Sequence, residues 1–281
     1  MIKKVSLYPN PKRDGDLSGA RLVAERLLEC GACVLVACEY EKAFGPAPAG
    51  LSFVEEDALF YESDCLVTLG GDGTILSVAR KAADAGIPIF GINLGHVGFL
   101  AALEASELEQ VDRLVAGDYT VSSRMLLSCS INGKEELLAL NECVIAPERG
   151  FHIVELTLDA DGRHVCDFRA DGLIFNTPTG STGYAFSAGG AVIDSEFDCI
   201  GVKAISSYML INAHHMIFRP ETEFTVKKSR SAGSRVTVCA DGREERSLKL
   251  GDTVRICRSE KRVKLIFLKN ESNLEVFFRK F

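Results

Sequence analysis

A string of three glycines around an aspartate, Gly70–Thr74, has residue types suited to phosphate chemistry. It follows a short apolar run that reads as a strand, and it precedes apolar residues at helical spacing. At the carboxyl end of a parallel strand, glycines let backbone N–H groups approach phosphate oxygens, and the N-terminus of the next helix favours the anion. Asp72 would repel a phosphate, so we expect its carboxylate to hold a sugar hydroxyl or to steer a Mg²⁺ ion that the phosphoryl donor carries. The structural alternative is a turn with an N-terminal Asp cap.

A second segment, Thr177–Gly190, is rich in hydroxyls and glycines and follows the predicted strand Leu173–Asn176. Its string Thr-Pro-Thr-Gly-Ser-Thr-Gly-Tyr places many small hydrogen-bonding groups on one loop. Such a density of Thr, Ser and Gly makes a poor hydrophobic core, so the segment predicts a ligand-binding loop. A plain surface loop would tolerate this composition but would not explain the ordered string.

Two shorter motifs also carry polar groups. Asn93–Leu100 follows a predicted strand and has two glycines for a backbone surface against a ligand, with Phe99 available to a flat ring. Asn141-Glu142 lies in the predicted strand Leu137–Ala146 and pairs an amide, suited to adenine or hydroxyls, with a carboxylate suited to a ribose diol. Neighbours on a regular strand point to opposite faces, so we expect only one of the two side chains to point inward.

Taken together, these motifs resemble those of the bacterial-type NAD kinase family, which uses ATP or polyphosphate. Gly70–Thr74 is similar to the family's glycine–aspartate motif, and Asn93–Phe99 is similar to its second signature. Asn141-Glu142 matches its Asn-Glu/Asp pair, and Thr177–Gly190 matches its threonine- and glycine-rich signature. The first motif alone also fits diacylglycerol and sphingosine kinases, so only the full set singles out NAD kinases.

The resemblance implies a phosphotransferase that acts on an alcohol group, the 2′-hydroxyl of the adenosine ribose of NAD, to give NADP. The donor would be ATP or polyphosphate, and Mg²⁺ would come with the donor rather than bind to residues of the chain. Asp72 would be the catalytic base, and Gly70, Gly71 and Thr74 would form the donor-phosphate loop. The residues that the resemblance places at or near the dinucleotide are Gly73, Phe99, Asn141, Glu142, Arg169, Asp171, Thr182, Tyr184, Ser187 and His214. The family forms homodimers or homotetramers, and Asp171 would reach across a subunit interface.

The chain departs from the family pattern at a few positions. Gly183 stands where Ala is usual, and Ala191 stands where Pro is common. The segment 209–213 lacks the prolines usual before His214, which leaves the role of His214 open beside a structural role shared with His215. Two other functions stay open as well: a lipid kinase, which would need an exposed apolar groove, and a dinucleotide-binding protein with a decayed catalytic site. The choice of donor, of NAD or NADH, and of dimer or tetramer is not settled by the sequence.

The composition limits the function further. The chain has 281 residues, 47% of them hydrophobic and 25% charged, which is typical of a globular protein. A formal net charge of -7 argues against non-specific binding to nucleic acid or to an anionic membrane. The ten cysteines lie mostly in apolar runs and are expected to be reduced small hydrophobes. No signal peptide is visible, and the longest uncharged stretch, 172–193, makes a poor lipid-facing helix because of its Pro, Gly, Ser and Thr residues, so we expect a cytoplasmic protein.

The elements that must position the motifs alternate between strand and helix over residues 1–121. Val5–Tyr8, Cys65–Leu69 and Ile87–Ile92 read as strands, and Asp16 is expected to cap a helix with an apolar face at three- and four-residue spacing. Such alternation predicts an α/β domain with a mostly parallel sheet, which would carry the donor site and the glycine–aspartate loop.

Beyond residue 121 the pattern changes to strands. Three turn dipeptides, Asn132-Gly133, Asp161-Gly162 and Asp241-Gly242, are each flanked by alternating or β-branched runs. We expect residues 122–269 to form a predominantly β domain, a sandwich of two sheets that binds the dinucleotide. The apolar and basic segment 270–281 is a candidate to pack back on the first domain.

Overall fold

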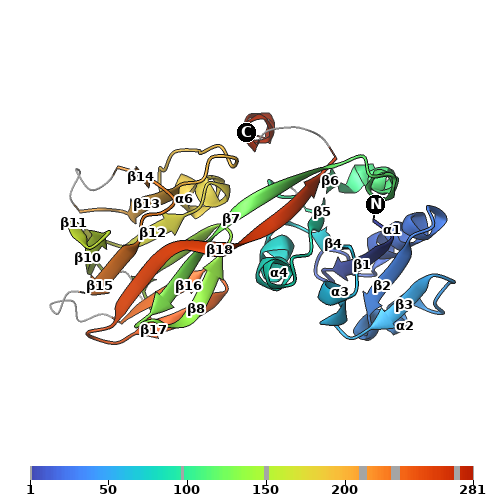
Figure 1. Ribbon diagram of the computed structural model, residues 1–281, viewed down its shortest axis with the longest axis horizontal. Helices are drawn as coiled ribbons and strands as arrows, with labels where there is room; N and C mark the ends of the chain where they lie inside the picture. Colours follow the sequence, from blue (N-terminus) through green and yellow to red (C-terminus); the bar gives the residue numbers. More distant parts are fainter. Residues whose placement is uncertain are drawn as a thin grey trace. The chain divides into compact units, whose positions relative to one another are not determined.

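The computed structural model describes residues 2–95, 98–148, 152–208, 214–228, 235–268 and 273–280. The chain divides into two compact units (Figure 1). The N-terminal unit comprises Met1–Ser123 and Val263–Phe281, and the sandwich unit comprises Arg124–Arg262. Each unit has its own hydrophobic core.

The N-terminal unit is built from alternating strands and helices. In chain order they are β1 (Lys4–Pro9), α1 (Ser18–Glu29), β2 (Cys33–Ala37), α2 (Glu41–Phe44), β3 (Leu51–Val54), α3 (Ala58–Tyr61), β4 (Cys65–Gly70), α4 (Asp72–Ala85), β5 (Ile89–Asn93), β6 (Leu103–Glu104), α5 (Asp112–Ala116) and, at the end of the chain, α7 (Asn273–Lys280). The strand order is β3-β2-β1-β4-β5, and each of these neighbouring pairs is parallel. The predicted α/β unit with a mostly parallel sheet is confirmed.

The order of these strands reverses between β1 and β4. β2 and β3 extend the sheet on one side of β1, whereas β4 and β5 extend it on the other. In open α/β sheets, ligands bind at the carboxyl ends of the strands where the order reverses. The glycine–aspartate loop follows β4 directly, so it lies at this point of the sheet.

Helix α1 has the expected apolar face, but its cap differs from the prediction. The inward residues are Ala20, Val23, Ala24 and Leu27. The carboxylate of Asp14 accepts the N–H groups of Gly19 and Ala20 at 3.0 and 2.8 Å, while Asp16 accepts the N–H and the hydroxyl of Ser18. Asp14 therefore shares with Asp16 the capping role that we assigned to Asp16 alone, and Leu17 adopts a left-handed conformation just before the helix.

The sandwich unit consists of two sheets of mainly antiparallel strands. Its strands are β7 (Thr120–Ile131), β8 (Lys134–Ala139), β9 (Glu142–Pro147), β10 (Val154–Ala160), β11 (Arg163–Ala170), β12 (Gly172–Asn176), β13 (Ile200–Ile205), β14 (Met216–Phe218), β15 (Phe224–Lys228), β16 (Val236–Ala240), β17 (Glu244–Leu248) and β18 (Thr253–Phe267), with the short helix α6 (Tyr184–Ser187) after β12. One sheet has the order β14-β13-β12-β9-β16-β17, and the other runs β11-β10-β15-β18, with β7 beside β18 and β8 beside β7. The first residues of β7 and the last residues of β18 belong to the N-terminal unit. There, β18 pairs in parallel with β5.

The three predicted turn dipeptides all join antiparallel strands. They connect β7 to β8, β10 to β11, and β16 to β17. In each, both residues have positive φ, from 49° at Asp161 and Asp241 to 74° at Gly162. The type I′ turn of a two-residue hairpin needs this conformation, and Asn or Asp followed by Gly adopts it at little cost. The first two connections are two-residue loops, whereas the loop from β16 to β17 has a third residue, Arg243.

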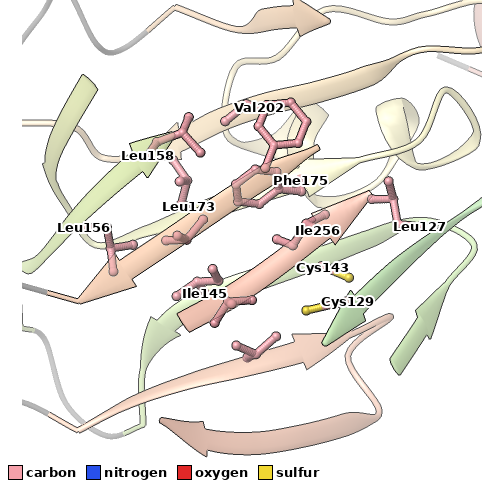
Figure 2. Packing of buried hydrophobic residues seen from close by; sticks show 14 of the residues in the cluster. Leu127, Cys129, Cys143, Ile145, Leu156, Leu158, Leu173, Phe175, Val202 and Ile256 are labelled. Atoms are coloured by element: carbon pink, nitrogen blue, oxygen red, sulfur yellow. The ribbon is translucent and has the colours of Figure 1, made fainter. Parts of the chain in front are cut away.

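The core of the sandwich lies between the two sheets and is mainly aliphatic (Figure 2). Phe175 of β12 is fully buried, and its ring lies 5.3 Å from that of Phe224 in β15. Figure 2 shows the sulfur atoms of Cys129 and Cys143 pointing toward one another within this core. The hydrogen bond with Cys129, followed by burial, raises the pKa of the Cys143 thiol. Both residues act as small hydrophobic side chains, as the sequence predicts.

The predicted strand Leu137–Ala146 is wrong as a single element. The chain leaves β8 at Ala139, bends, and enters β9 at Glu142, so the two halves belong to different sheets. The apolar pattern continues across the bend because the residues on both sides of it are buried in the same core. Periodicity alone could not reveal the break.

Among the residues that the structure describes, no helix has the length and apolarity needed to cross a membrane.

The buried pair of phenylalanines gives a test of this packing. Replacing Phe175 with Ala should lower the free energy of unfolding by about 3–5 kcal/mol, because the lost ring leaves a cavity in a closed core. Guanidinium denaturation of the sandwich unit within the full-length protein measures this loss. Phe197→Ala is the control, since that ring is 63% exposed and its loss should change stability by no more than about 0.5 kcal/mol. Equal losses in the two variants would contradict the packing described.

Candidate active site

The glycine–aspartate loop presents Asp72 as the first residue of α4. Its side chain is half-buried, and both carboxylate oxygens are engaged by the backbone of a second segment. The N–H of Phe99 donates to one oxygen at 2.8 Å, and the N–H of Leu100 donates to the other at 3.1 Å. Because hydrogen bonds to a carboxylate are charge-assisted, they fix the direction of this side chain strongly.

Thr74 holds the loop from inside. The residue is buried, and its hydroxyl accepts hydrogen bonds from Asn10 Nδ2 at 2.9 Å and, weakly, from the N–H of Gly71 at 3.4 Å. A Cβ on Gly70 would collide with this hydroxyl, so glycine is required there. Gly73 is exposed. Sequence reasoning missed Asn10, and the only available signal was an amide immediately after the strand β1.

The segment after β5 is organised by Asn93, which is 1% exposed. Its side-chain amide donates to Glu104 at 2.7 Å and accepts the N–H of Gly95 at 3.0 Å. A Cβ on Gly98 would lie 3.1 Å from a carboxylate oxygen of Asp72, so this glycine allows the close approach of the two segments. The backbone of Phe99 is thereby brought to Asp72; residues 96 and 97 lie outside the described part of the chain.

The bend between β8 and β9 is built around Asp241, from the turn that joins β16 to β17. Its carboxylate accepts the N–H groups of Leu140, Asn141 and Glu142 at 2.8, 2.8 and 3.1 Å. The N–H of Asp241 in turn donates to the carbonyl of Glu142 at 3.0 Å. Burial raises the pKa of Asp241, and the three N–H donors oppose that rise. Sequence reasoning assigned this residue only to a turn.

The bend changes how Asn141 and Glu142 are presented. Asn141 precedes the first residue of β9, so strand alternation does not separate the two side chains. A Cβ on Gly183 would lie 3.1 Å from Oε2 of Glu142 and 3.7 Å from Nδ2 of Asn141. Both side chains therefore reach the same point, and our expectation that only one would point inward is wrong.

Glu142 is a buried acid with an incomplete set of partners. Among the described residues, its Oε2 atom has no hydrogen-bond partner, although a backbone N–H of Tyr184 reaches the carboxylate. Burial, followed by the charge of Asp241, raises the pKa of Glu142 from 4.5 to about 7. A buried polar atom without a partner is costly, so this oxygen is suited to a ligand donor.

The loop after β12 packs its backbone directly against this bend. The hydroxyl of Thr177 donates to the carbonyl of Leu140 at 2.6 Å, and a Cβ on Gly180 would collide with the carbonyl of Asn141. Ser181 donates to the carbonyl of Pro178 at 2.7 Å. The hydroxyls of Thr177 and Ser181 therefore donate to backbone carbonyls of the protein. The side chains of Thr182 and Tyr184 remain accessible to a ligand.

His215, rather than its neighbour, ties this loop together. Its Nδ1 atom accepts the N–H of Ala191 at 3.0 Å, so Nε2 carries the proton and donates to Asn176 at 3.0 Å. Burial, followed by the charge of Lys203, lowers the pKa of His215 and favours this neutral form. His214, the residue implied by the resemblance, is exposed. No pattern in the sequence distinguishes the two histidines.

The other residues implied by the resemblance make their contacts elsewhere in the sandwich unit. Arg169 of β11 forms an ion pair with Glu155 at 3.3 Å and lies 5.4 Å from the ring of Tyr208. The backbone N–H of Asp171 donates to the carbonyl of Ile205, and its side chain is exposed. Ser187 is exposed at the end of α6.

Within the described ranges, no three His, Cys, Asp or Glu side chains gather closely enough to hold a metal ion. The loop at α4 offers one carboxylate, that of Asp72. Such a donor set suits a Mg²⁺ ion that is held mainly by the phosphates of a substrate and by water.

Comparison with known families agrees with this geometry. Residues 52–119 match the model of the ATP-NAD kinase N-terminal domain, and residues 140–268 match that of the ATP-NAD kinase C-terminal domain. The first match contains the glycine–aspartate loop, and the second contains the bend at Glu142 and the threonine- and glycine-rich loop.

Individual proteins are similar over most of their length. The chain is 37% identical over 227 residues to an NAD kinase of Geotalea daltonii, covering 79% of each chain. It is 35% identical to NAD kinase 2 of Streptomyces avermitilis, covering 99% of this chain and 94% of that protein.

Solved structures have the same fold. An NAD kinase from Archaeoglobus fulgidus in complex with ATP superposes with a TM-score of 0.75 at 28% identity, covering 99% of this chain and 98% of that one. Yeast NADH kinase complexed with NADH gives a TM-score of 0.83 at 21% identity, over 99% of this chain and 86% of that one, a likeness of fold. With both domain models matched and relatives above 30% identity along most of the sequence, the chain belongs to the NAD kinase family.

Proposed function

We propose that Asp72 orients the 2′-hydroxyl of the adenosine ribose of NAD for attack on the terminal phosphorus of the donor. The reaction itself follows from the family: the chain is an NAD kinase, a phosphotransferase to an alcohol group that converts NAD into NADP. The observation that carries the proposal for Asp72 is its pair of hydrogen bonds from Phe99 and Leu100, which fix the carboxylate where β4 and β5 end. A substrate hydroxyl would donate a further hydrogen bond to it.

A carboxylate is a weak base toward a sugar hydroxyl, yet the chemistry does not need a strong one. Phosphoryl transfer passes through a loose transition state in which positioning and charge neutralisation supply most of the rate. The proton of the nucleophile therefore leaves late, and Asp72 accepts it at that stage. Phosphorus gains the bond to the ribose oxygen as it loses the bond to the leaving oxygen of the donor.

The donor would be held at the start of α4. This loop has no side chain at Gly70, Gly71 or Gly73, so phosphate oxygens could approach its backbone N–H groups closely. The N-terminus of the helix also attracts the negative charge of a phosphate. Thr74 supports this loop through its buried hydroxyl rather than by touching the donor. Mg²⁺, arriving with the donor, would neutralise charge on its phosphate oxygens. ATP is the expected donor, and polyphosphate remains an alternative.

The dinucleotide would be recognised in the sandwich unit at the bend around Glu142. The carboxylate of Glu142, the amide of Asn141 and the accessible groups of Thr182, Tyr184 and Ser187 offer acceptors and donors for ribose hydroxyls and an amide. We place Arg169, Asp171 and His214 near the dinucleotide as well, at the edge of its binding site. Self-association as a dimer or tetramer, and a cytoplasmic location, remain predictions from the sequence and from the resemblance.

The two rival functions find less support. A lipid kinase shares only the glycine–aspartate loop, whereas this chain also matches the C-terminal domain model of the ATP-NAD kinases. A binding protein without catalysis would have no need to hold Asp72 by two backbone donors. A lipid kinase also leaves the threonine- and glycine-rich loop unexplained.

Replacing Asp72 with Asn tests the proposal directly. We expect turnover to fall by about 10²–10⁴-fold, the range typical of a lost general base, while the KM for NAD changes little. NADP formation is measured with an NADP-specific dehydrogenase in the presence of Mg²⁺ and either ATP or polyphosphate. Asp84→Asn, an exposed aspartate near the other end of α4, is the matched control and should keep full activity. Wild-type turnover in Asp72→Asn would remove Asp72 from the mechanism.

The raised pKa of Glu142 predicts a pH dependence of NAD binding. If the ionised carboxylate accepts hydrogen bonds from ribose hydroxyls, NAD should bind more tightly as pH rises through about 7. In Glu142→Gln the affinity should be weaker and nearly constant between pH 6 and 8. Calorimetric titration of NAD at several pH values measures both. A variant that retained the wild-type pH profile would show that another group titrates.

The same pKa predicts an effect on the stability of the ligand-free protein. The pKa of Glu142 is raised from 4.5 to about 7 on folding, so the folded state retains the proton more strongly, and stability is lost as pH rises through this range. Glu142→Gln removes the buried charge, so its stability gain over wild type should be larger at pH 8 than at pH 5. Thermal unfolding at the two pH values measures this gain, with the exposed Glu245→Gln as control. An equal gain at both pH values would contradict the assignment.

A further inference from the structure

The C-terminal helix α7 buries an aromatic side chain in the N-terminal unit. Phe277 is 6% exposed, whereas the next residue, Phe278, is 77% exposed. The ring of Phe277 stacks on that of Phe99, with centroids 6.2 Å apart and an angle of 29° between the planes. The helix therefore contacts the same residue whose backbone N–H donates to Asp72.

The position of residues 99 and 100 determines where the Asp72 carboxylate points. Both of its oxygens accept N–H groups from this dipeptide, so a shift of the dipeptide would carry the carboxylate with it or break the two bonds. On one side the dipeptide is held by the core, since Leu100 is 5% exposed and the N–H of Ala102 donates to the carbonyl of Gly91 at 2.7 Å. On the other side, the half-buried ring of Phe99 rests on Phe277.

We propose that Phe277 is a positioning residue for the phosphoryl transfer: through the ring of Phe99 it fixes the two backbone amides that aim Asp72. The proposal rests on the role proposed above for Asp72. It assigns a catalytic purpose to the C-terminal helix, which lies about 200 residues away from the glycine–aspartate loop in the sequence. Displacing a catalytic group by about 1 Å can cost about 10²-fold in rate, so a modest loosening of Phe99 should be measurable.

The test compares Phe277→Ala with Phe278→Ala, two substitutions of the same kind on adjacent residues of one helix. We expect kcat to fall by about tenfold in Phe277→Ala, with the KM values for NAD and ATP within about twofold of wild type. Phe278→Ala should keep the wild-type kcat, and Phe277→Leu should recover part of the loss by restoring apolar volume. Equal kcat values in the two alanine variants would overturn the proposal.

A double mutant separates positioning from general structural damage. If Phe277 acts through Asp72, then adding Phe277→Ala to Asp72→Asn should lower the remaining rate far less than it lowers the wild-type rate. A full tenfold loss in the Asp72→Asn background would contradict the proposal. Wild-type turnover in Asp72→Asn alone would instead refute the role of Asp72, which distinguishes the two failures.

Amide hydrogen exchange gives a readout that does not depend on activity. In the full-length protein, the amides of Phe99 and Leu100 should exchange faster in Phe277→Ala than in wild type, because their bonds to Asp72 open more often. Exchange in Phe278→Ala should match wild type. Unchanged exchange at these two amides in Phe277→Ala would overturn the proposal even if the variant had lost activity.

Discussion

A carboxylate that accepts neighbouring backbone N–H groups shapes the site in each unit of the protein. Asp72 accepts the N–H groups of Phe99 and Leu100, and Asp241 accepts those of Leu140, Asn141 and Glu142. Amide donors next to one another can converge on a single carboxylate only where the chain leaves regular strand geometry. Each aspartate therefore stabilises an irregular segment, and each segment carries groups that the chemistry needs.

These segments lie close to their supports because glycine occupies the points of contact. Gly70 leaves room for the hydroxyl of Thr74, Gly98 for Asp72, and Gly180 for the carbonyl of Asn141. None of these three glycines has a positive φ, so backbone conformation does not explain them. Their role is steric: a side chain would push apart backbones whose contact holds the site.

The fold class could be predicted from the sequence because it depends on local signals. The spacing of apolar residues predicted the strands and helices of the α/β unit. The Asn-Gly and Asp-Gly dipeptides predicted three hairpin turns, because these residues readily adopt the left-handed conformation found there. The strand through residues 137–146 was predicted wrongly, since the bend at Asn141 is imposed by Asp241, a residue 100 positions away. Local propensity carries no information about such a partner.

The candidate site could be predicted only in part, because several of its residues also act through partners distant in sequence. Asp72 and Glu142 were found because they sit in compact motifs, whereas Asn10, Asp241 and His215 act through partners distant in sequence. The loop Thr177–Gly190 was predicted to bind a ligand, yet the hydroxyls of Thr177 and Ser181 within it donate to backbone carbonyls and stabilise the loop itself. Composition identifies a loop rich in hydrogen-bonding groups, but only the fold decides which groups are used internally.

Phosphorus NMR of the reaction with Mg²⁺ and ATP shows directly which hydroxyl of NAD the chain phosphorylates. One sample contains NAD, and the other contains an analogue that lacks the 2′-hydroxyl on the adenosine ribose. We expect a new phosphomonoester resonance on the dinucleotide with NAD and none with the analogue. Equal phosphorylation of the analogue, or release of inorganic phosphate without a phosphorylated dinucleotide, would contradict this expectation.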